Sequence, residues 1–230
     1  MDKPKNENVT GHSRVQDAVY NMAQWYLERK PQFLERATTR FERECQFFLD
    51  DDRDEMLQLA MNLVFTDWIL FESDVFDSPA IQYYLANCDD VSDENRGILG
   101  QVDSNQKFDF FRFDGLLEDG VNGNGIVVYD PFAGREISVH SEASHDYARN
   151  ACWSTGTGVS MRITEVDGES YVIGQFFAHD KAQFDGSMTL VSARLSHAYN
   201  TSPMLPIAMD ILNPNGLFRE TRVVESTLAA

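Results

Sequence analysis

The sequence predicts an α+β protein with a helical N-terminal half followed by a small antiparallel β unit. Up to about residue 103, apolar residues recur at spacings of three and four, which is the period of an α-helix. From about residue 104 they alternate with other residues, which is the period of a strand. Of the 230 residues, 43% are hydrophobic and 12% are aromatic, so the chain can bury a sizeable core.

Three long helices are expected first, within residues 13–103 and after a polar lead-in of residues 1–12 that predicts disorder. Ser13 is a candidate N-cap for the first helix, and Pro31 is placed to open the second. The aspartates at 50–52 precede the third helix, where the helix dipole favours negative charge. The apolar stripes are Val15, Ala18, Val19, Met22 and Tyr26; Phe33, Ala37, Phe41, Cys45 and Phe48; and Met56, Leu59, Ala60, Leu63 and Val64.

Two short helices complete the helical region. Ser78 followed by Pro79 is typical of a helix start, with proline in the first turn. Ser92 is a candidate cap for the next helix. Trp68 and Phe71, near the end of the third long helix, are expected in the core.

The β unit is expected over residues 104–200. Five strands are predicted at 108–113, 125–129, 135–140, 159–163 and 171–178. The glycine-rich segment 120–125 predicts a turn, and residues 186–195 fit a strand or a helix. Residues 201–230 are expected to form a short helix at 203–212 and a tail, both packed on the same domain.

Charge limits the classes of partner. Asp and Glu number 37 against 19 Lys and Arg, giving a net charge of −18. Nucleic acids and anionic membranes both attract clustered basic residues, so neither is an expected partner. Most of the negative charge lies in residues 51–120, which hold 17 acidic and 4 basic residues.

Cysteine usage and the ends of the chain predict a cytoplasmic protein. Cys45, Cys88 and Cys152 are widely spaced and form no CxxC pair, which favours reduced thiols over disulfides. The N-terminus is polar and lacks the apolar region of a secretory signal. No stretch is apolar enough to span a membrane.

Four short patterns occur together, at residues 65–68 (FTDW), 78–85 (SPAIQYYL), 129–139 (YDPFAGREISV) and 161–163 (MRI). In this order they resemble a family of bacterial proteins without an established activity, some of which carry a C-terminal SEC-C zinc motif. The resemblance covers roughly residues 60–180 and implies a helical front part followed by a β unit with an Asp-x-x-x-Gly turn. That zinc motif needs clustered cysteines near the C-terminus, and no cysteine follows Cys152. The resemblance therefore implies no zinc site here.

His140, Glu142 and His145 are the candidate metal ligands. Imidazole and carboxylate groups both suit zinc. Their spacing is not that of HExxH, and His145 is expected in the loop after a strand that ends at His140. Ordinary surface or turn residues are the alternative, and no cofactor is expected.

A Cys–His nucleophile is the candidate catalytic pair. Cys152 could pair with His140, His145 or His179, but a reactive thiol needs a nearby cation or a helix N-terminus. The Ser-, Thr- and Gly-rich residues after Cys152 supply neither. A metal-dependent or Cys/His hydrolase built on residues 140–152 is thus the alternative function.

The preferred hypothesis is a noncatalytic protein-interaction or adaptor protein with an acidic surface for a basic partner protein, and self-association stays open. Exposed aromatic side chains also mark interaction surfaces. A strand with phenylalanines on both of its faces exposes some of them unless both faces are covered. Single-stranded nucleic acid binding on that strand would need a basic groove, which the composition does not supply. The candidate surface residues are Asp74, Asp77, Asp89, Asp90, Phe111 and Phe113.

Overall fold

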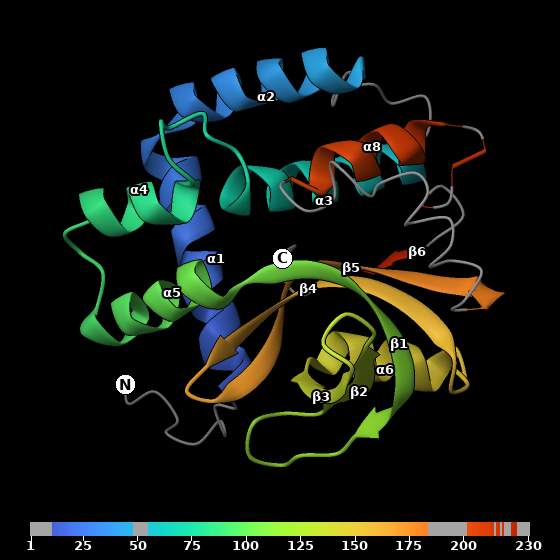
Figure 1. Ribbon diagram of the computed structural model, residues 1–230. Helices are drawn as coiled ribbons and strands as arrows, with labels where there is room; N and C mark the ends of the chain where they lie inside the picture. The colour runs from blue at the N-terminus through green and yellow to red at the C-terminus, as the bar shows by residue number, and fades with distance from the viewer. Residues whose placement is uncertain are drawn as a thin grey trace, which may run out of the picture.

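The computed structural model describes residues 11–47, 55–183, 202–213, 215–216, 218 and 222–224. Within these residues the helices lie mostly in the N-terminal half and the strands in the C-terminal half, so the predicted α+β class is confirmed (Figure 1). None of the described helices is both long enough and apolar enough to cross a membrane. Several sequence predictions lie outside the described residues: most of the lead-in, the Ser13 side chain, Phe48, the aspartates at 50–52 and the segment 186–195.

Five helices form the N-terminal layer: α1 (Gly11–Arg29), α2 (Pro31–Cys45), α3 (Glu55–Phe71), α4 (Ala80–Asn87) and α5 (Asp93–Asn105). The predicted stripe of α1 is buried, as are Ala37, Phe41 and Cys45 of α2, whereas Phe33 is only partly buried. Trp68 of α3 is buried as expected. The prediction is wrong at Met56, which is exposed, while its neighbour Leu57 in the same turn of α3 packs against the core.

The ends of the short helices agree with the sequence in part. The Ser92 hydroxyl accepts a hydrogen bond from the Asn95 amide at 3.2 Å, which confirms the predicted cap of α5. The start of α4 differs by one position, because Pro79 itself takes the N-cap place and the helix begins at Ala80.

The strands close into a barrel. They are β1 (Lys107–Leu117), β2 (Gly125–Asp130), β3 (Arg135–His140), β4 (Thr157–Val166), β5 (Glu169–Gln183) and β6 (Arg222–Val224), in the order β3-β2-β1-β4-β5-β6. A short parallel pairing joins the end of β3 to the start of β5, at Val139 with Ser170 and at His140 with Tyr171. The other pairings are antiparallel, as predicted. The parallel β3–β5 pairing alone makes the described sheet a mixed one.

The connectivity of the barrel is a Greek key. Strands β1, β2 and β3 are consecutive neighbours, and β4 returns by a longer connection to lie on the other side of β1. Strand β1 pairs with β4 over residues 107–112 and with β2 over residues 112–117, and a register shift between Phe113 and Gly115 bends it.

Two further helices complete the described part. The predicted C-terminal helix is present as α8 (Met204–Leu212), which packs on α3 and α2. The sequence missed α6 (Glu142–Asn150), which lies between β3 and β4 where a loop was expected. The sequence of α6 is mostly polar and gave no apolar stripe that would predict a helix. Only Ser144, His145 and Ala148 of this helix are buried.

The core has two parts, one on each side of the barrel wall. The helical layer packs outside β1, β4 and β5, against Phe108, Phe110 and Phe177. The barrel interior holds Phe111 and Phe113 with Trp153 and residues of α6. The sequence offered these two phenylalanines as surface candidates and left open that both faces of their strand are covered. Their place among the surface candidates is wrong, because the unforeseen α6 covers their side of the strand and buries both.

Candidate functional site

His140 ends β3 and is buried. Its Nδ1 lies 2.7 Å from the carbonyl oxygen of Gly123, so that nitrogen carries a proton and donates. Its Nε2 lies 3.4 Å from a carboxylate oxygen of Glu169, the first residue of β5. His140 also pairs with Tyr171 in the parallel contact between β3 and β5. Both ring nitrogens therefore have partners, and the imidazole ties the β1–β2 loop to the start of β5.

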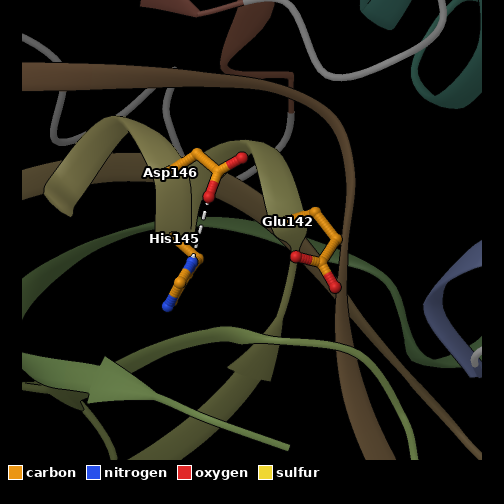
Figure 2. A group of neighbouring side chains, drawn as sticks. All are labelled: Glu142, His145 and Asp146. Carbon is orange, nitrogen blue, oxygen red and sulfur yellow. Dashed lines mark hydrogen bonds and ion pairs between the residues drawn. The ribbon is translucent and has the colours of Figure 1, made fainter. Parts of the chain in front are cut away.

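His145 lies in α6 and forms a cluster with Glu142 and Asp146, whose ligand atoms all lie within 4.8 Å of one another. Figure 2 shows the Asp146 carboxylate bonded to the His145 ring, with Glu142 one turn earlier on the same helix. The structure thus places two of the three predicted ligands together and puts Asp146 where His140 was expected. The reason is α6, since a helix brings residues three apart to one side.

The atoms of this cluster already have partners. The Nδ1 atom of His145 lies 3.2 Å from Asp146, and its Nε2 lies 3.2 Å from both Glu118 and Arg149. The Glu142 carboxylate accepts from the Asn124 amide at 3.0 Å. A metal ion would have to displace these contacts beside the Arg149 cation. As it stands, the cluster fastens α6 to the loop between β1 and β2.

We expect zinc added to the purified chain to give no binding tighter than micromolar affinity in calorimetry, because both nitrogens of His145 are engaged and Arg149 repels a cation. His145→Ala and His140→Ala serve as a matched pair of variants. Tight zinc binding that disappears in the first variant and persists in the second would establish a metal centre in the cluster.

Cys152 does not form a catalytic pair in the described residues. It is exposed in the turn after α6, with a backbone φ of 53°, and its amide donates to the Arg149 carbonyl. No described histidine makes a hydrogen bond to its thiol: the rings of His140, His145 and His179 have other partners.

Asp74 and Asp77 lie in the segment between α3 and α4, on one side of a groove of about 590 Å³. The other side of the groove is α2, which presents Arg36, Arg40 and Arg43. Arg40 bonds to Asp74, and that guanidinium lowers the pKa of the Asp74 carboxyl. This half of the predicted acidic surface is therefore mixed in charge.

Asp89 and Asp90 lie in the loop between α4 and α5, followed by Asp93 and Glu94 in the first turn of α5. We call these four residues the α4–α5 acidic loop. All four are exposed. Asp90 pairs with Arg29 at 3.4 Å and Glu94 with Arg14 at 3.5 Å, so arginines of α1 offset part of the charge. Asp89 and Asp93 make no ion pair with any described residue.

A buried ionic network joins the helical layer to the barrel. Arg162 of β4 lies between Asp67 and Glu72, and the three side chains are 3%, 0% and 4% exposed. The Arg162 Nε donates to Asp67 at 2.8 Å. Burial raises the pKa of Glu72, although Arg162 acts against that rise. Burial also opposes charge on Arg162, but the two carboxylates outweigh it and raise the pKa of the guanidinium.

The network also reaches β5 and α8. The second oxygen of Asp67 accepts from the Gln175 amide, next to Gly174 at a φ of 70°. A Cβ on Gly174 would lie 2.1 Å from that oxygen, so only glycine lets the strand approach the carboxylate. Glu72 accepts from the Ser202 hydroxyl at 2.8 Å and the Met204 amide at 3.1 Å, which anchors the start of α8.

Ser160 and His179 form a second buried polar pair. The Ser160 Oγ lies 2.9 Å from the Nε2 of His179, whose ring sits between Phe110 and Phe218. Burial lowers the pKa of His179 to about 3, so its ring is neutral at physiological pH. Its Nδ1 has no partner among the described residues. Both side chains are fully enclosed, so the pair is a core contact rather than an accessible base.

The comparisons with protein-family models, with curated proteins and with solved structures find no match to this chain. The resemblance to bacterial proteins with a SEC-C motif therefore stays a prediction.

Sequence reasoning missed both buried polar groups, although one signal was present. Asp67 is the single charge before the apolar run WILF, and Arg162 is the single charge in the segment VSMRI of a predicted strand. A single charge in a buried segment needs a partner of opposite sign. Two such segments in one chain are candidates for pairing. The Ser160–His179 contact had no comparable signal.

Proposed function

We propose that this chain is a noncatalytic protein-interaction protein that binds a basic partner protein through the α4–α5 acidic loop. The observation that carries the proposal is the exposure of four carboxylates within six residues, two of them without an ion pair among the described residues. Complementary charge of this kind speeds association and selects among partners.

The loop is held in shape, which supports a role in recognition. Arg96 of α5 donates to the carbonyl oxygens of Leu85 at 2.6 Å and Cys88 at 3.1 Å, at the end of α4. The Ser92 cap fixes the start of α5. A surface that is already ordered loses less conformational entropy when a partner binds.

The scattered positions of the candidate catalytic groups also favour a noncatalytic role. A hydrolase needs a nucleophile and a base within hydrogen-bond reach of each other. Cys152 is exposed in a turn, and His140 and His145 are buried with partners of their own. The competing hydrolase hypothesis therefore lacks the pairing it needs among the described residues.

We infer that the chain works in the cytoplasm. Cys45 and Cys88 are buried and unpaired, as is usual for thiols in a reducing compartment.

Neutralising two carboxylates of the loop should weaken partner recovery. In pull-downs from cells that make the protein, Asp89→Asn with Asp93→Asn should recover less of its basic partners than the unaltered chain. Recovery by the unaltered chain should fall as salt rises, because exposed charges are screened. Glu55→Gln with Glu165→Gln is the matched control, since it removes the same charge from exposed positions elsewhere.

The alternative explanation is that these acids only favour the start of α5 through the helix dipole. In that case the loop variant would lower the free energy of unfolding by up to about 1 kcal/mol and leave partner recovery equal to that of the control. Equal recovery, or recovery that ignores ionic strength, contradicts the proposal.

A further inference from the structure

The ammonium group of Lys30 lies among three aromatic rings where α1 meets α2. Its Nζ is 5.4 Å from the centre of the Trp25 ring, 5.7 Å from that of Phe33 and 5.6 Å from that of Tyr83. The three rings come from α1, α2 and α4, and each is partly exposed. We call them the aromatic cage. The face of an aromatic ring attracts a cation, so the cage is a cation site that the chain's own lysine occupies.

Neighbouring rings hold the cage in shape. Phe76, which is buried, lies 5.0 Å from Phe33 and 5.4 Å from Tyr83, measured between ring centres. The ring of Tyr84 makes an edge contact with Trp25 at 5.3 Å. Two walls of the cage also touch each other, since the Phe33 and Tyr83 rings lie 5.9 Å apart. A site whose walls are already ordered loses little conformational entropy when a ligand binds.

The ammonium of Lys30 is held by the rings alone. Among the described residues no carboxylate pairs with it, although the neighbouring Arg29 does pair with Asp90. The backbone is fixed separately: the Lys30 amide donates to the Tyr26 carbonyl at 2.9 Å, and Pro31 opens α2 directly afterwards. The side chain can therefore leave the cage while the backbone stays in place, and the only attraction lost is that between the cation and the rings.

The dimensions of the cage fit an ammonium larger than that of lysine. A methyl group extends about 1.5 Å from the nitrogen and packs at about 3.7 Å from ring carbons, so the nitrogen of a fully methylated ammonium lies about 5 Å from each ring. An ammonium that carries only hydrogens can come closer. The Nζ distances of 5.4, 5.6 and 5.7 Å are therefore close to those of a methylated ammonium. Aromatic cages are the usual means by which proteins recognise such groups.

We propose that the aromatic cage binds a methylated ammonium group, which displaces the Lys30 side chain. The group is carried either by a free quaternary ammonium compound or by a methylated lysine of a protein, because both present the same chemistry. Arg36 lies over the Phe33 ring but over neither of the other two rings, so it does not occupy the centre of the cage. Lys30 competes with the ligand and lowers its apparent affinity by the fraction of chains whose cage is open. The site goes beyond the α4–α5 acidic loop and does not depend on it.

Choline and its uncharged isostere 3,3-dimethylbutan-1-ol test this site, because they share a shape and differ in charge. The full chain is titrated with each, and the NMR shift of the ligand methyl protons is followed. Choline should bind about tenfold more tightly than the isostere, and the ring currents of the cage should move its methyl signal upfield. A short neutral peptide with one trimethyllysine distinguishes the sources: tighter binding than choline indicates a protein ligand, and weaker binding indicates a free compound.

Variants of the cage show whether Lys30 is the competitor. Lys30→Ala should bind choline about tenfold more tightly than the unaltered chain, a factor equivalent to about 1.4 kcal/mol. Arg29→Ala is the matched control, since it removes the same charge from the adjacent residue and leaves the cage filled. It should change the affinity by less than about twofold, because an exposed charge is screened. Phe33→Leu added to Lys30→Ala should abolish the gain while circular dichroism shows the fold intact.

Three results would overturn the proposal. One is that the Lys30→Ala chain binds no choline, which means that the rings form no site when the lysine is removed. Another is equal binding of choline and 3,3-dimethylbutan-1-ol, which indicates an apolar pocket without cation recognition. The third is an equal gain in Lys30→Ala and Arg29→Ala, which indicates a general effect of charge. None of these measurements involves the basic partner, so the acidic-loop proposal stands or fails separately.

Discussion

Arg162→Met is expected to lower the free energy of unfolding by about 3–5 kcal/mol, the usual loss when one partner of a buried ion pair is removed. The variant leaves Asp67 and Glu72 buried beside each other without a cation. Their desolvation is then uncompensated, and the contacts that hold α3 against β4 are lost. Urea denaturation of the purified chain, followed by circular dichroism, measures the change.

The triple variant Asp67→Asn, Glu72→Gln and Arg162→Met is the control for the charge itself. It removes all three charges while keeping oxygen acceptors for Gln175, Ser202 and Met204. Because no unpaired charge is left in the core, it should recover more than half of the stability lost in the single variant. A single variant that costs less than about 1 kcal/mol, the range of an exposed pair, would contradict a buried network.

Lowering the pH from 7 to 5 should destabilise the chain by about 2 kcal/mol through His179 alone. The folded-state pKa of His179 is about 3, below the ordinary value of 6.5. Between pH 6.5 and pH 3, the unfolded chain therefore binds a proton at His179 that the folded chain does not bind. The stabilisation is complete above pH 6.5 and is lost progressively as the pH falls toward 3.

His179→Phe combined with Ser160→Ala isolates this contribution. The double variant removes the titrating ring and the hydroxyl that would otherwise be left without its partner. Buried carboxylates such as Glu72 and Asp109, whose pKa values are raised by burial, titrate in both proteins. The difference between the two denaturation profiles from pH 7 to pH 5 should therefore be the His179 effect. Parallel profiles would show that this ring is solvated.

The parts of the fold that sequence could predict are those set by local pattern. These local signals are the apolar stripes of α1 and α2, the cap at Ser92 and the alternating pattern of the strands. The structure contains the helices, the cap and the strands that these signals predict. Two features could not be predicted in this way. The polar α6 has little apolar periodicity of its own, and the β3–β5 contact that closes the barrel depends on how distant strands curve.

The candidate sites show the same division. Exposure of Asp89 and Asp90 follows from a polar loop between two helices, so it could be predicted. Burial of Phe111 and Phe113 depends on a helix about 30 residues further along, so it could not. The arginines that pair with Asp74 and Asp90 come from α2 and α1. Charge that is concentrated in the sequence is therefore partly offset in space by residues distant in the chain.

Hydrogen–deuterium exchange of the chain, alone and with the basic partner recovered in the pull-down, tests the central proposal most directly. Partner binding should slow exchange of the backbone amides in residues 88–94, at the end of α4 and the start of α5. It should leave residues 142–152, which contain α6 and Cys152, unchanged. Protection confined to residues 140–152, with none at the α4–α5 acidic loop, would contradict the proposal.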